Sequence, residues 1–277
     1  NFHTPSIYKE GYIDLIIEYC KKYKIKMVIS LLDLELTILS KKKHVFEEHG
    51  ILLAISNYQI CKICNDKYAT QEFLKANNFP TLHMFLTVEE AIKAVYDRKA
   101  SFPFFIKPRW GMGSIGVYQV ENEEELKVLY LKVKKELQKS SLKEGSKALK
   151  GQDVIIQEKL PGEEFGLDVF NNFKGNHIKT FIKKKITMRA GETDAAVTVA
   201  NPTLEELGKN VSKKLKHFGN LDMDVFYDGQ TAYILELNPR FGGGYPFTHL
   251  AGGNIVKAYI DLYSNRDLNL DDYYIGL

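Results

Sequence analysis

The 277 residues exceed the length of most single domains, and an ordinary globular composition of 44% hydrophobic residues makes two or three lobes sharing a cleft the expected arrangement. A net charge of +3, from 38 Lys and Arg against 35 Asp and Glu, gives no indication of a nucleic-acid partner. The apolar runs are too short to cross a bilayer, so no membrane partner is expected. The three cysteines are an odd number and do not form a disulfide framework, which favours a cytoplasmic protein.

The first part of the chain alternates helical and strand patterns. Residues 9–23 predict a helix, and the continuous apolar run 25–32 predicts a strand that is covered on both faces. Asp33 could cap the next helix, and a second buried strand follows from Ile51. This order predicts two parallel strands in a partial Rossmann-like lobe, residues 1–65, to which an earlier strand would normally belong.

Residues 66–158 predict a small subdomain built around a glycine-bearing hairpin. Its predicted helices cover 66–77, 88–96 and 123–139, and Thr87 should cap the second of these. Strands are predicted at 102–106 and 117–120, on either side of a turn that contains three glycines.

Residues 159–277 predict a second subdomain dominated by antiparallel strands. Together with the strand before it, the predicted strands cover 154–157, 165–170, 177–182, 221–227 and 232–237. Tight turns at 173–176 and 227–230 should join neighbouring strands as hairpins. The predicted fold class is therefore α/β, of the α+β kind, with an antiparallel C-terminal sheet.

Gly111, Gly113 and Gly116 satisfy the pattern G-x-G-x-x-G, which dinucleotide-binding folds place before a helix. Here strand residues follow the last glycine, so the loop joins two strands and can fold over phosphate groups through its backbone N–H groups. The sequence has neither a Walker loop nor the protein-kinase motifs. Lys107 and Arg109 at the mouth of the loop favour a phosphate ligand over a glycine-rich hairpin without a ligand.

The most informative stretch is the predicted strand that ends in Glu236, Leu237 and Asn238. Alternation along a strand puts Ile234, Glu236 and Asn238 on one face, with Leu235 and Leu237 on the opposite face. We therefore expect the carboxylate and the amide to share one side of the sheet.

Asp224, on the preceding strand of the hairpin, could lie beside Glu236 and Asn238. Two carboxylates and an amide oxygen suit a magnesium ion that bridges ATP phosphates. Arg240 could then bind a phosphate or a carboxylate, and the glycines 242–244 could form an open backbone wall for a substrate. The alternative is a row of carboxylates at a solvated sheet edge.

These features together resemble the ATP-grasp superfamily, particularly carbamoyl-phosphate-synthase-like ligases. The resemblance covers nearly the whole chain and depends on five ordered motifs: NDKYATQEFLKANNFP, PFFIKPRWGMGSIGV, IIQEKLPGEEFGLDV, TVANP and DMDVFYDGQTAYILELNPRFGGGYP. It implies an ATP-grasp fold with a partial Rossmann-like N-terminal lobe, a small hairpin-lid subdomain and a C-terminal antiparallel sheet.

The resemblance also implies roles for individual residues. ATP would be bound by two lysines, the glycine lid, a hinge segment and a ribose-binding carboxylate: Lys67, Lys107, Gly111, Gly113, Ser114, Gly116, Glu158, Lys159, Leu160 and Glu164. Asp224, Glu236 and Asn238 would hold Mg²⁺ or Mn²⁺, with Arg240 and Lys107 acting at the transferred phosphoryl group.

The activity implied by the resemblance is that of a carboxylate–amine ligase. A small carboxylate becomes an acyl phosphate, and an amine displaces phosphate to form an amide, with ADP as the other product. Arg189 could bind a carboxylate of the acceptor, Glu192 an ammonium group, and Gly243 could line the substrate site. The resemblance is compatible with a homodimer.

Other reactions stay open. A single module, and no histidine in the loop at 189–193, disfavour carbamoyl phosphate as the product. The alternatives are phosphorylation or carboxylation of a small acid, or a nucleotide sensor without activity. The intact set of Lys107, Glu236, Asn238 and Arg240 argues against a sensor.

Two further patterns have plainer explanations. Cys61 and Cys64, with His44 and His49 upstream, could be written as a zinc site, but packing on one helix face explains them better. The basic run 183–185 is interpreted as a solvated strand on which the middle lysine points away from its neighbours.

Overall fold

A computed structural model describes residues 2–111, 116–140, 142–143, 149, 151–189 and 191–276. The predicted lid residues Gly113 and Ser114, and the side chain of Glu192, lie outside this description. Within the described residues no helix is both long enough and apolar enough to span a membrane.

The N-terminal lobe is a pair of short parallel strands surrounded by helices. Its elements are α1 (Tyr12–Lys22), β1 (Met27–Val28), α2 (Asp33–Lys41), α3 (Lys43–Glu48), β2 (Leu52–Leu53) and α4 (Tyr58–Asn65). The predicted parallel pairing is confirmed, with Met27 opposite Leu52. The strand predicted at 25–32 is much shorter, because β1 pairs only with the two residues of β2.

Asp33 does not cap α2 as predicted. The N-cap residue is Leu32, without a side-chain hydrogen bond, and Asp33 is the first residue of the helix. Leu36 and Leu39 on the same helix are buried in the core of the lobe. The position of Asp33 is therefore set by a packed helix, and its carboxylate is available for another partner.

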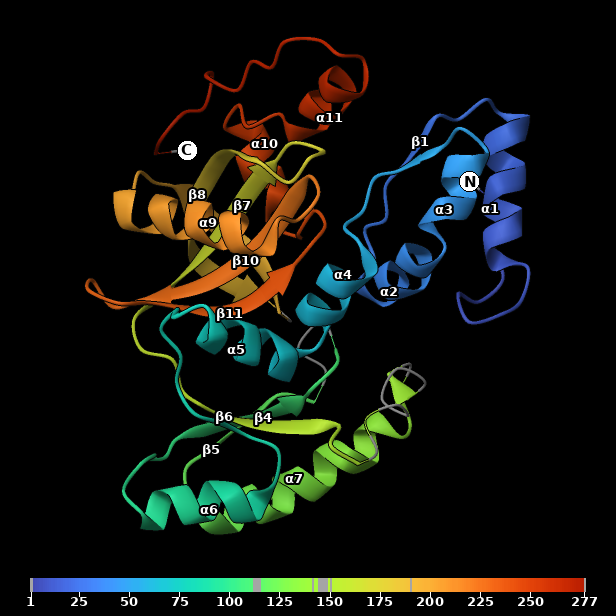
Figure 1. Ribbon diagram of the computed structural model, residues 1–277. Coiled ribbons are helices and arrows are strands. Elements are labelled where there is room, and N and C mark those ends of the chain that lie inside the picture. Colours follow the sequence, from blue (N-terminus) through green and yellow to red (C-terminus); the bar gives the residue numbers. More distant parts are fainter. Residues whose placement is uncertain are drawn as a thin grey trace.

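The middle subdomain is a four-stranded antiparallel sheet with two helices on one side. Its elements are α5 (Lys67–Ala76), β3 (Met84–Phe85), α6 (Val88–Tyr96), β4 (Phe104–Pro108), β5 (Tyr118–Val120), α7 (Glu123–Leu137) and β6 (Val154–Glu158). The strand order is β3-β6-β4-β5. Thr87 caps α6 as predicted, because its hydroxyl accepts the N–H of Glu90. Figure 1 shows α6 and α7 beneath the sheet and α5 above it.

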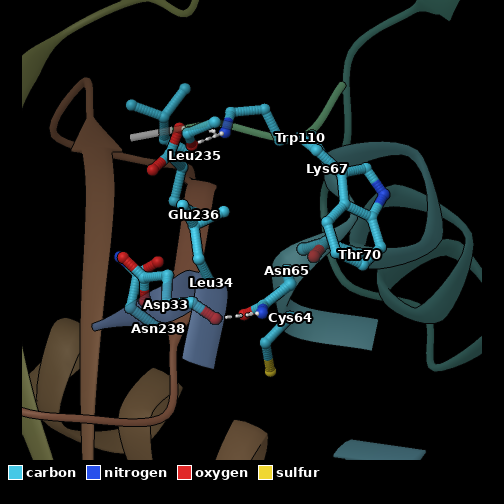
Figure 2. A pocket seen from close by; sticks show the side chains of 11 residues that line it. Asp33, Leu34, Cys64, Asn65, Lys67, Thr70, Trp110, Leu235, Glu236 and Asn238 are labelled. Carbon is cyan, nitrogen blue, oxygen red and sulfur yellow. Dashed lines mark hydrogen bonds and ion pairs between the residues drawn. The ribbon is translucent and has the colours of Figure 1, made fainter. Parts of the chain in front are cut away.

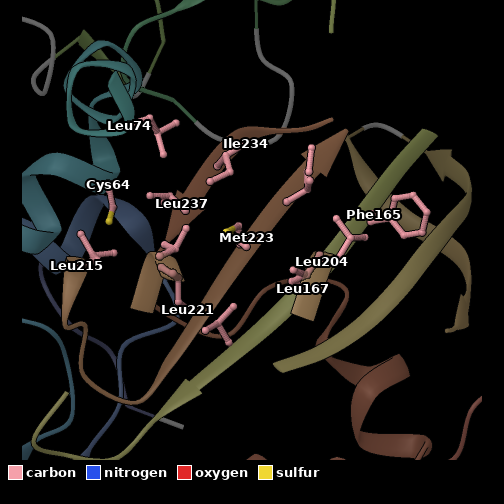
Figure 3. Packing of buried hydrophobic residues seen from close by; sticks show 14 of the residues in the cluster. Cys64, Leu74, Phe165, Leu167, Leu204, Leu215, Leu221, Met223, Ile234 and Leu237 are labelled. Atoms are coloured by element: carbon pink, nitrogen blue, oxygen red, sulfur yellow. The ribbon is translucent and has the colours of Figure 1, made fainter. Parts of the chain in front are cut away.

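The C-terminal subdomain is a five-stranded antiparallel sheet in the order β11-β10-β7-β8-β9. Its elements are β7 (Glu163–Asn171), β8 (His177–Arg189), β9 (Glu192–Thr198), α9 (Pro202–Leu215), β10 (Asn220–Tyr227), β11 (Ala232–Asn238), α10 (Tyr245–Leu250) and α11 (Ile255–Tyr263). One face of this sheet packs against apolar side chains of α4, α5 and α9, as Figure 3 shows for Cys64, Leu74 and Leu215.

A β-bulge interrupts the pairing of β10 with β11. Asp224 lies opposite Glu236, whereas Val225 lies opposite Ile234, so Leu235 is an extra residue on β11. Ile234 therefore joins Leu237 in the apolar core, and Leu235 lies on the side of Glu236. The prediction from alternation was wrong for Ile234 and Leu235, because one inserted residue reverses the faces of the residues before it.

Candidate active site

A large cavity lies between the two antiparallel sheets. Its volume is about 1270 Å³, including space open to solvent. From the middle subdomain it is lined by Lys67, Phe105, Lys107, Pro108, Gly111, Val117, Gln157 and Glu158, and from the C-terminal subdomain by Lys159, Leu160, Glu164, Lys185, Met188, Gly191, Asp224, Phe226, Leu235 and Glu236. Most of the predicted ATP-binding residues that the structure describes thus share one cavity.

The predicted hinge segment forms one edge of the large cavity. The N–H of Glu158 donates to the carbonyl of His83 at 3.1 Å, and the N–H of Lys159 donates to the carbonyl of Pro103 at 3.3 Å. The carboxylate of Glu158 accepts the backbone N–H of His83 at 2.9 Å. Two of the three hinge N–H groups therefore already make backbone hydrogen bonds, to residues that directly precede β3 and β4, which gives the edge a rigid backbone.

Two lysines reach the large cavity from separate elements. The Nζ of Lys67, at the start of α5, lies 3.2 Å from Glu236 Oε1 and donates to the carbonyl of Gly111 at 2.9 Å. Lys107 on β4 is buried, and its pKa is lowered to about 8, mainly by burial; Glu236 opposes this shift and Lys67 adds to it. Both ammonium groups thus gather beside the carboxylate of Glu236.

Arg109 has a structural role that was not predicted. Its Nε and Nη2 each donate to the carboxylate of Asp66 at 2.7 Å, and Asp66 Oδ1 also caps α5 by accepting the N–H groups of Tyr68 and Ala69. The carbonyl of Arg109 accepts the N–H of Lys67. Arg109 therefore connects the start of the glycine loop to α5.

The predicted metal carboxylates meet across β10 and β11. Asp224 lies opposite Glu236, and Asp222 lies opposite Asn238. Burial, and next the repulsion of Asp222, raise the pKa of Asp224 to about 7 although Lys185 lies 2.6 Å away. Burial also acts to raise the pKa of Glu236, but Lys67 and Lys107 outweigh it and leave this pKa below the ordinary value.

This donor set fits a hard divalent cation. Asp224 and Glu236 supply carboxylate oxygens, and Asn238 donates through Nδ2 to Asp222 at 3.4 Å, which leaves its amide oxygen for a metal. No group of three or more His, Cys, Asp or Glu in the described part of the chain is arranged to hold a metal ion, so this candidate site depends on two carboxylates and one amide. Cys61 and Cys64 are buried on α4 with free thiols.

A second, polar cavity adjoins the large one. Its volume is about 750 Å³, including space open to solvent, and its lining residues are Asp33, Gly111, Gly166, Lys183, Lys185, Gly191, Thr193, Asp222, Asp224, Glu236, Asn238, Arg240, Gly243 and Gly244. The two cavities share Gly111, Lys185, Gly191, Asp224 and Glu236. The two carboxylates predicted to bind the metal, Asp224 and Glu236, therefore lie in the wall between the cavities.

The interpretation of residues 183–185 as a solvated strand was wrong for two of the three lysines. Lys183 is 1% exposed and pairs with Asp168 at 2.6 Å, whereas Lys185 pairs with both Glu164 and Asp224. Both lysines line the polar cavity. Their partners lie on other strands, β7 and β10. The sequence of β8 alone therefore predicts only that the middle lysine points in the opposite direction.

The predicted substrate residues are only partly brought to the site. Gly243 lines the polar cavity, whereas Arg189 is 79% exposed in its side chain and pairs with Asp194 at 2.7 Å. Arg240 lines the polar cavity and makes two ion pairs, with Asp33 of the N-terminal lobe and with Asp222 of β10. Neither carboxylate was predicted from the sequence to be a partner of Arg240.

A smaller pocket of about 420 Å³ extends from the shared wall toward the N-terminal lobe. Figure 2 shows Asp33 and Asn238 on one side of it, facing Asn65 and Lys67. The Nδ2 of Asn65 donates to the backbone carbonyl of Asp33 at 2.6 Å. This contact ties the end of α4 to the start of α2.

Comparisons with known proteins match two regions of the chain to family models. A family model described as an ATP-grasp domain matches residues 100–247, and one described as a PylC-like N-terminal domain matches residues 1–54. The D-alanine–D-alanine ligase of Thermotoga maritima is 28% identical over 220 residues, which are 72% of this chain and 66% of that protein. The carbamoyl phosphate synthase large chain of Clostridium acetobutylicum is 22% identical over 96% of this chain and 24% of its own length.

Solved structures show the same fold at low identity. The biotin carboxylase domain of the Hydrogenobacter thermophilus 2-oxoglutarate carboxylase, solved as a dimer with MgADP, has a TM-score of 0.76 at 18% identity, over 99% of this chain and 62% of that one. An L-amino acid ligase from Bacillus licheniformis has a TM-score of 0.68 at 19% identity, over 90% and 60%. The chain spans about two thirds or less of the length of each of these four proteins. Because the α/β fold is shared and the ATP-grasp model covers more than half of its residues, the chain belongs to the ATP-grasp family of ATP-dependent enzymes.

Proposed function

We propose that this ATP-grasp enzyme is a carboxylate–amine ligase. It would transfer the γ-phosphoryl group of ATP to a small carboxylate, and an amine would then displace phosphate to form an amide. The observation that carries this proposal is the shared wall: Asp224 and Glu236 border the large cavity and the polar cavity at once. A phosphoryl group held at that wall could pass from a nucleotide in one cavity to an acceptor in the other.

In this proposal the large cavity holds ATP. The apolar part of its lining and the rigid hinge backbone suit the adenine ring, and Glu164 suits the ribose hydroxyls. Lys67 and Lys107 would offset the charge of the phosphates. The ion pair of Lys67 with Glu236 keeps its ammonium group near the wall, and Lys107 lines the same cavity. The lowered pKa of Lys107 would rise again beside a polyphosphate.

Asp224, Glu236 and the amide oxygen of Asn238 would hold magnesium at the wall. When bound, the metal neutralises charge on the phosphate oxygens as the phosphoryl group moves. Lys185 and Arg240 supply protein charges on the acceptor side, where both line the polar cavity.

The polar cavity suits small substrates with charged groups. Lys183, Lys185 and Arg240 line it together with Asp222, so it offers both signs of charge within one space. An acid to be activated and an amine to attack it would both find complementary groups there. The names of two similar proteins, a D-alanine–D-alanine ligase and an L-amino acid ligase, are compatible with a ligase.

The test is ADP release from MgATP in the presence of a panel of amino acids and small carboxylates, each combined with candidate amines. Release that requires both an acid and an amine, with one new amide per ADP, is the expected result. Release with an acid alone would instead support phosphorylation or carboxylation. Nucleotide binding without ADP release from any combination would support a sensor and would count against the proposal.

A matched pair of variants keeps the test specific to the site. Glu236→Gln removes a carboxylate from the shared wall and is expected to lower substrate-dependent ADP release about 100-fold or more. Glu163→Gln makes the same change at a carboxylate that is exposed and pairs only with Lys184 at 2.7 Å. It is expected to leave the activity unchanged.

A further inference from the structure

The side chain of Arg240 crosses from the C-terminal subdomain to the N-terminal lobe. Its Nε donates to Asp33 Oδ1 at 2.8 Å, and its Nη2 donates to Asp33 Oδ2 at 2.7 Å. These two parallel bonds form the side-on fork that an arginine offers to a single carboxylate. Both side chains are largely buried, with 13% and 14% of their surfaces exposed. The pair is therefore a specific contact between two lobes rather than a solvated ion pair.

The remaining edge of the guanidinium is also occupied. Nη1 donates to Asp222 Oδ2 at 3.0 Å and to the carbonyl of Phe241 at 3.2 Å. A guanidinium has five N–H donors, and these contacts use four of them. Arg240 can therefore offer an incoming anion one N–H of Nη2, unless it leaves Asp33.

We infer that Asp33 is a positioning residue for Arg240. Asp33 holds the guanidinium so that Arg240 contacts the transferred phosphoryl group through one N–H donor, instead of binding an anion through two parallel hydrogen bonds. The inference depends on one part of the proposed function, namely that Arg240 meets this group. It does not depend on the amide-forming step or on the identity of the acid. Asp33 itself is not placed in contact with the substrate.

The position of Asp33 is set by its own lobe. It is the first residue of α2, whose Leu36 and Leu39 are buried, and its backbone carbonyl accepts Nδ2 of Asn65 at 2.6 Å. Neither contact involves the C-terminal sheet. The N-terminal lobe would thus act on the phosphoryl site through the carboxylate of Asp33. This role would account for the pairing of Asp33 with Arg240, 207 positions away in the chain.

A one-donor contact has a chemical advantage over a fork. Bidentate binding by Arg240 that stabilises free phosphate and the reactants as strongly as the moving phosphoryl group does not lower the barrier to phosphoryl transfer. It also slows the release of phosphate. The negative charge of Asp33 also weakens binding of any anion that rests beside Arg240. Asp33 should therefore favour turnover at the expense of affinity for a resting anion.

The experiment compares Asp33→Asn with the wild-type chain in two measurements. The first is the dissociation constant of inorganic phosphate in the presence of MgADP, measured by titration calorimetry. The second is the rate of ADP release, with substrates once known or as slow MgATP hydrolysis without them. Asp14→Asn is the control, because it removes the same charge from an exposed position of the same lobe.

The expected result is a split between the two measurements. Asp33→Asn should bind phosphate about fivefold or more tightly and release ADP about tenfold or more slowly, whereas Asp14→Asn should match the wild type in both. A purely structural role would weaken phosphate binding along with turnover. The gain in phosphate affinity should disappear when Arg240→Gln is added to Asp33→Asn.

Unchanged or weaker phosphate binding in Asp33→Asn overturns the inference, provided that Arg240→Gln alone loses phosphate binding. If Arg240→Gln also binds phosphate normally, the role of Arg240 in the proposed function fails instead, so the two failures are distinct. Should Asp33→Asn fold poorly, Asp33→Glu keeps the charge but shifts the carboxylate by one methylene. It is expected to lower turnover with phosphate affinity near the wild type, and normal turnover would overturn the inference.

Discussion

Asp224 on β10 and Glu236 on β11 lie directly opposite each other, immediately beside the β-bulge at Leu235. Each carboxylate faces a lysine, Lys185 for Asp224 at 2.6 Å and Lys67 for Glu236 at 3.2 Å. The bulge places Leu235 in the large cavity without moving either carboxylate from the shared wall. One irregularity in a hairpin thus lies between the apolar lining of the large cavity and the face proposed to bind the metal.

Glu236→Gln should lower the rate of ADP release about 100-fold or more, because one metal ligand is lost and the charge of two lysines is left uncompensated. The Mg²⁺ concentration needed for half-maximal activity should rise at the same time. Both quantities follow from ADP-release assays over a magnesium series. An activity loss with an unchanged magnesium requirement would contradict the metal assignment.

Lys185→Met should affect the protein far more than Lys184→Met, although the two lysines are neighbours on β8. Lys185 is 7% exposed in its side chain and pairs with Glu164 and Asp224, so its loss leaves two carboxylates without a partner, at a cost of about 3 kcal/mol or more. Lys184 pairs with Glu163 at the surface, where an ion pair contributes about 0–1 kcal/mol. Urea unfolding measures both stabilities.

The activities of the two variants should separate in the same way. Lys185→Met should lose most ADP release because Lys185 lines both cavities. Lys184→Met should keep wild-type activity. Equal effects of the two substitutions on stability and activity would mean that the faces of β8 are assigned incorrectly.

Local signals in the sequence were sufficient for much of the fold. The cap of α6 at Thr87, the helix after Asp66 and the C-terminal hairpins all follow from neighbouring residues, and the structure confirms them. The helix α9 was missed, although Asn201 caps it and Pro202 follows as its first residue, a combination that marks helix starts.

The remaining errors concern contacts between residues far apart in the chain. The bulge at Leu235 depends on how β11 pairs with β10, which periodicity within β11 does not report. The burial of Lys183 depends on Asp168, 15 residues away, and the partner of Arg240 lies 207 residues away at Asp33. Charged residues are buried only when paired, so their burial cannot be predicted until the partner is placed.

Gly242→Ala should lower the free energy of unfolding of the protein and distort the polar cavity. A Cβ atom at Gly242 would lie 2.2 Å from the carboxyl carbon of Asp222, and that carboxylate is held by Arg240 Nη1 at 3.0 Å. Such overpacking typically costs about 1–3 kcal/mol, here measured by urea unfolding, and should lower ADP release by displacing Arg240.

The clash at Gly242 requires both partners. In an Asp222→Ala background the added methyl group meets a smaller side chain, so Gly242→Ala should cost much less stability there than in the wild type. The four proteins of this cycle are compared in the same unfolding assay. Equal costs in both backgrounds would show that another neighbour of Gly242 is responsible.

His217 should make the protein less stable in mild acid. The ring is fully buried, its Nε2 lies 3.0 Å from the carbonyl of Val169, and its Nδ1 lies 3.3 Å from Nδ2 of Asn171. This arrangement fits the neutral ring, with Nε2 donating and Nδ1 accepting, because a proton on Nδ1 would face another donor. Burial is the main cause that lowers the pKa of His217 to about 4, from about 6.5 in an unfolded chain.

Because the unfolded chain binds the proton more readily, the stabilisation by neutral His217 is complete above pH 6.5 and is lost as the pH falls toward 4. Between pH 7.5 and pH 5.0 the free energy of unfolding should decrease by about 2 kcal/mol through this residue. Urea unfolding at both pH values should show that His217→Gln lacks this part of the decrease, whereas His49→Gln, at an exposed position, retains it. An equal decrease in wild-type and His217→Gln proteins would mean that other groups cause the acid sensitivity.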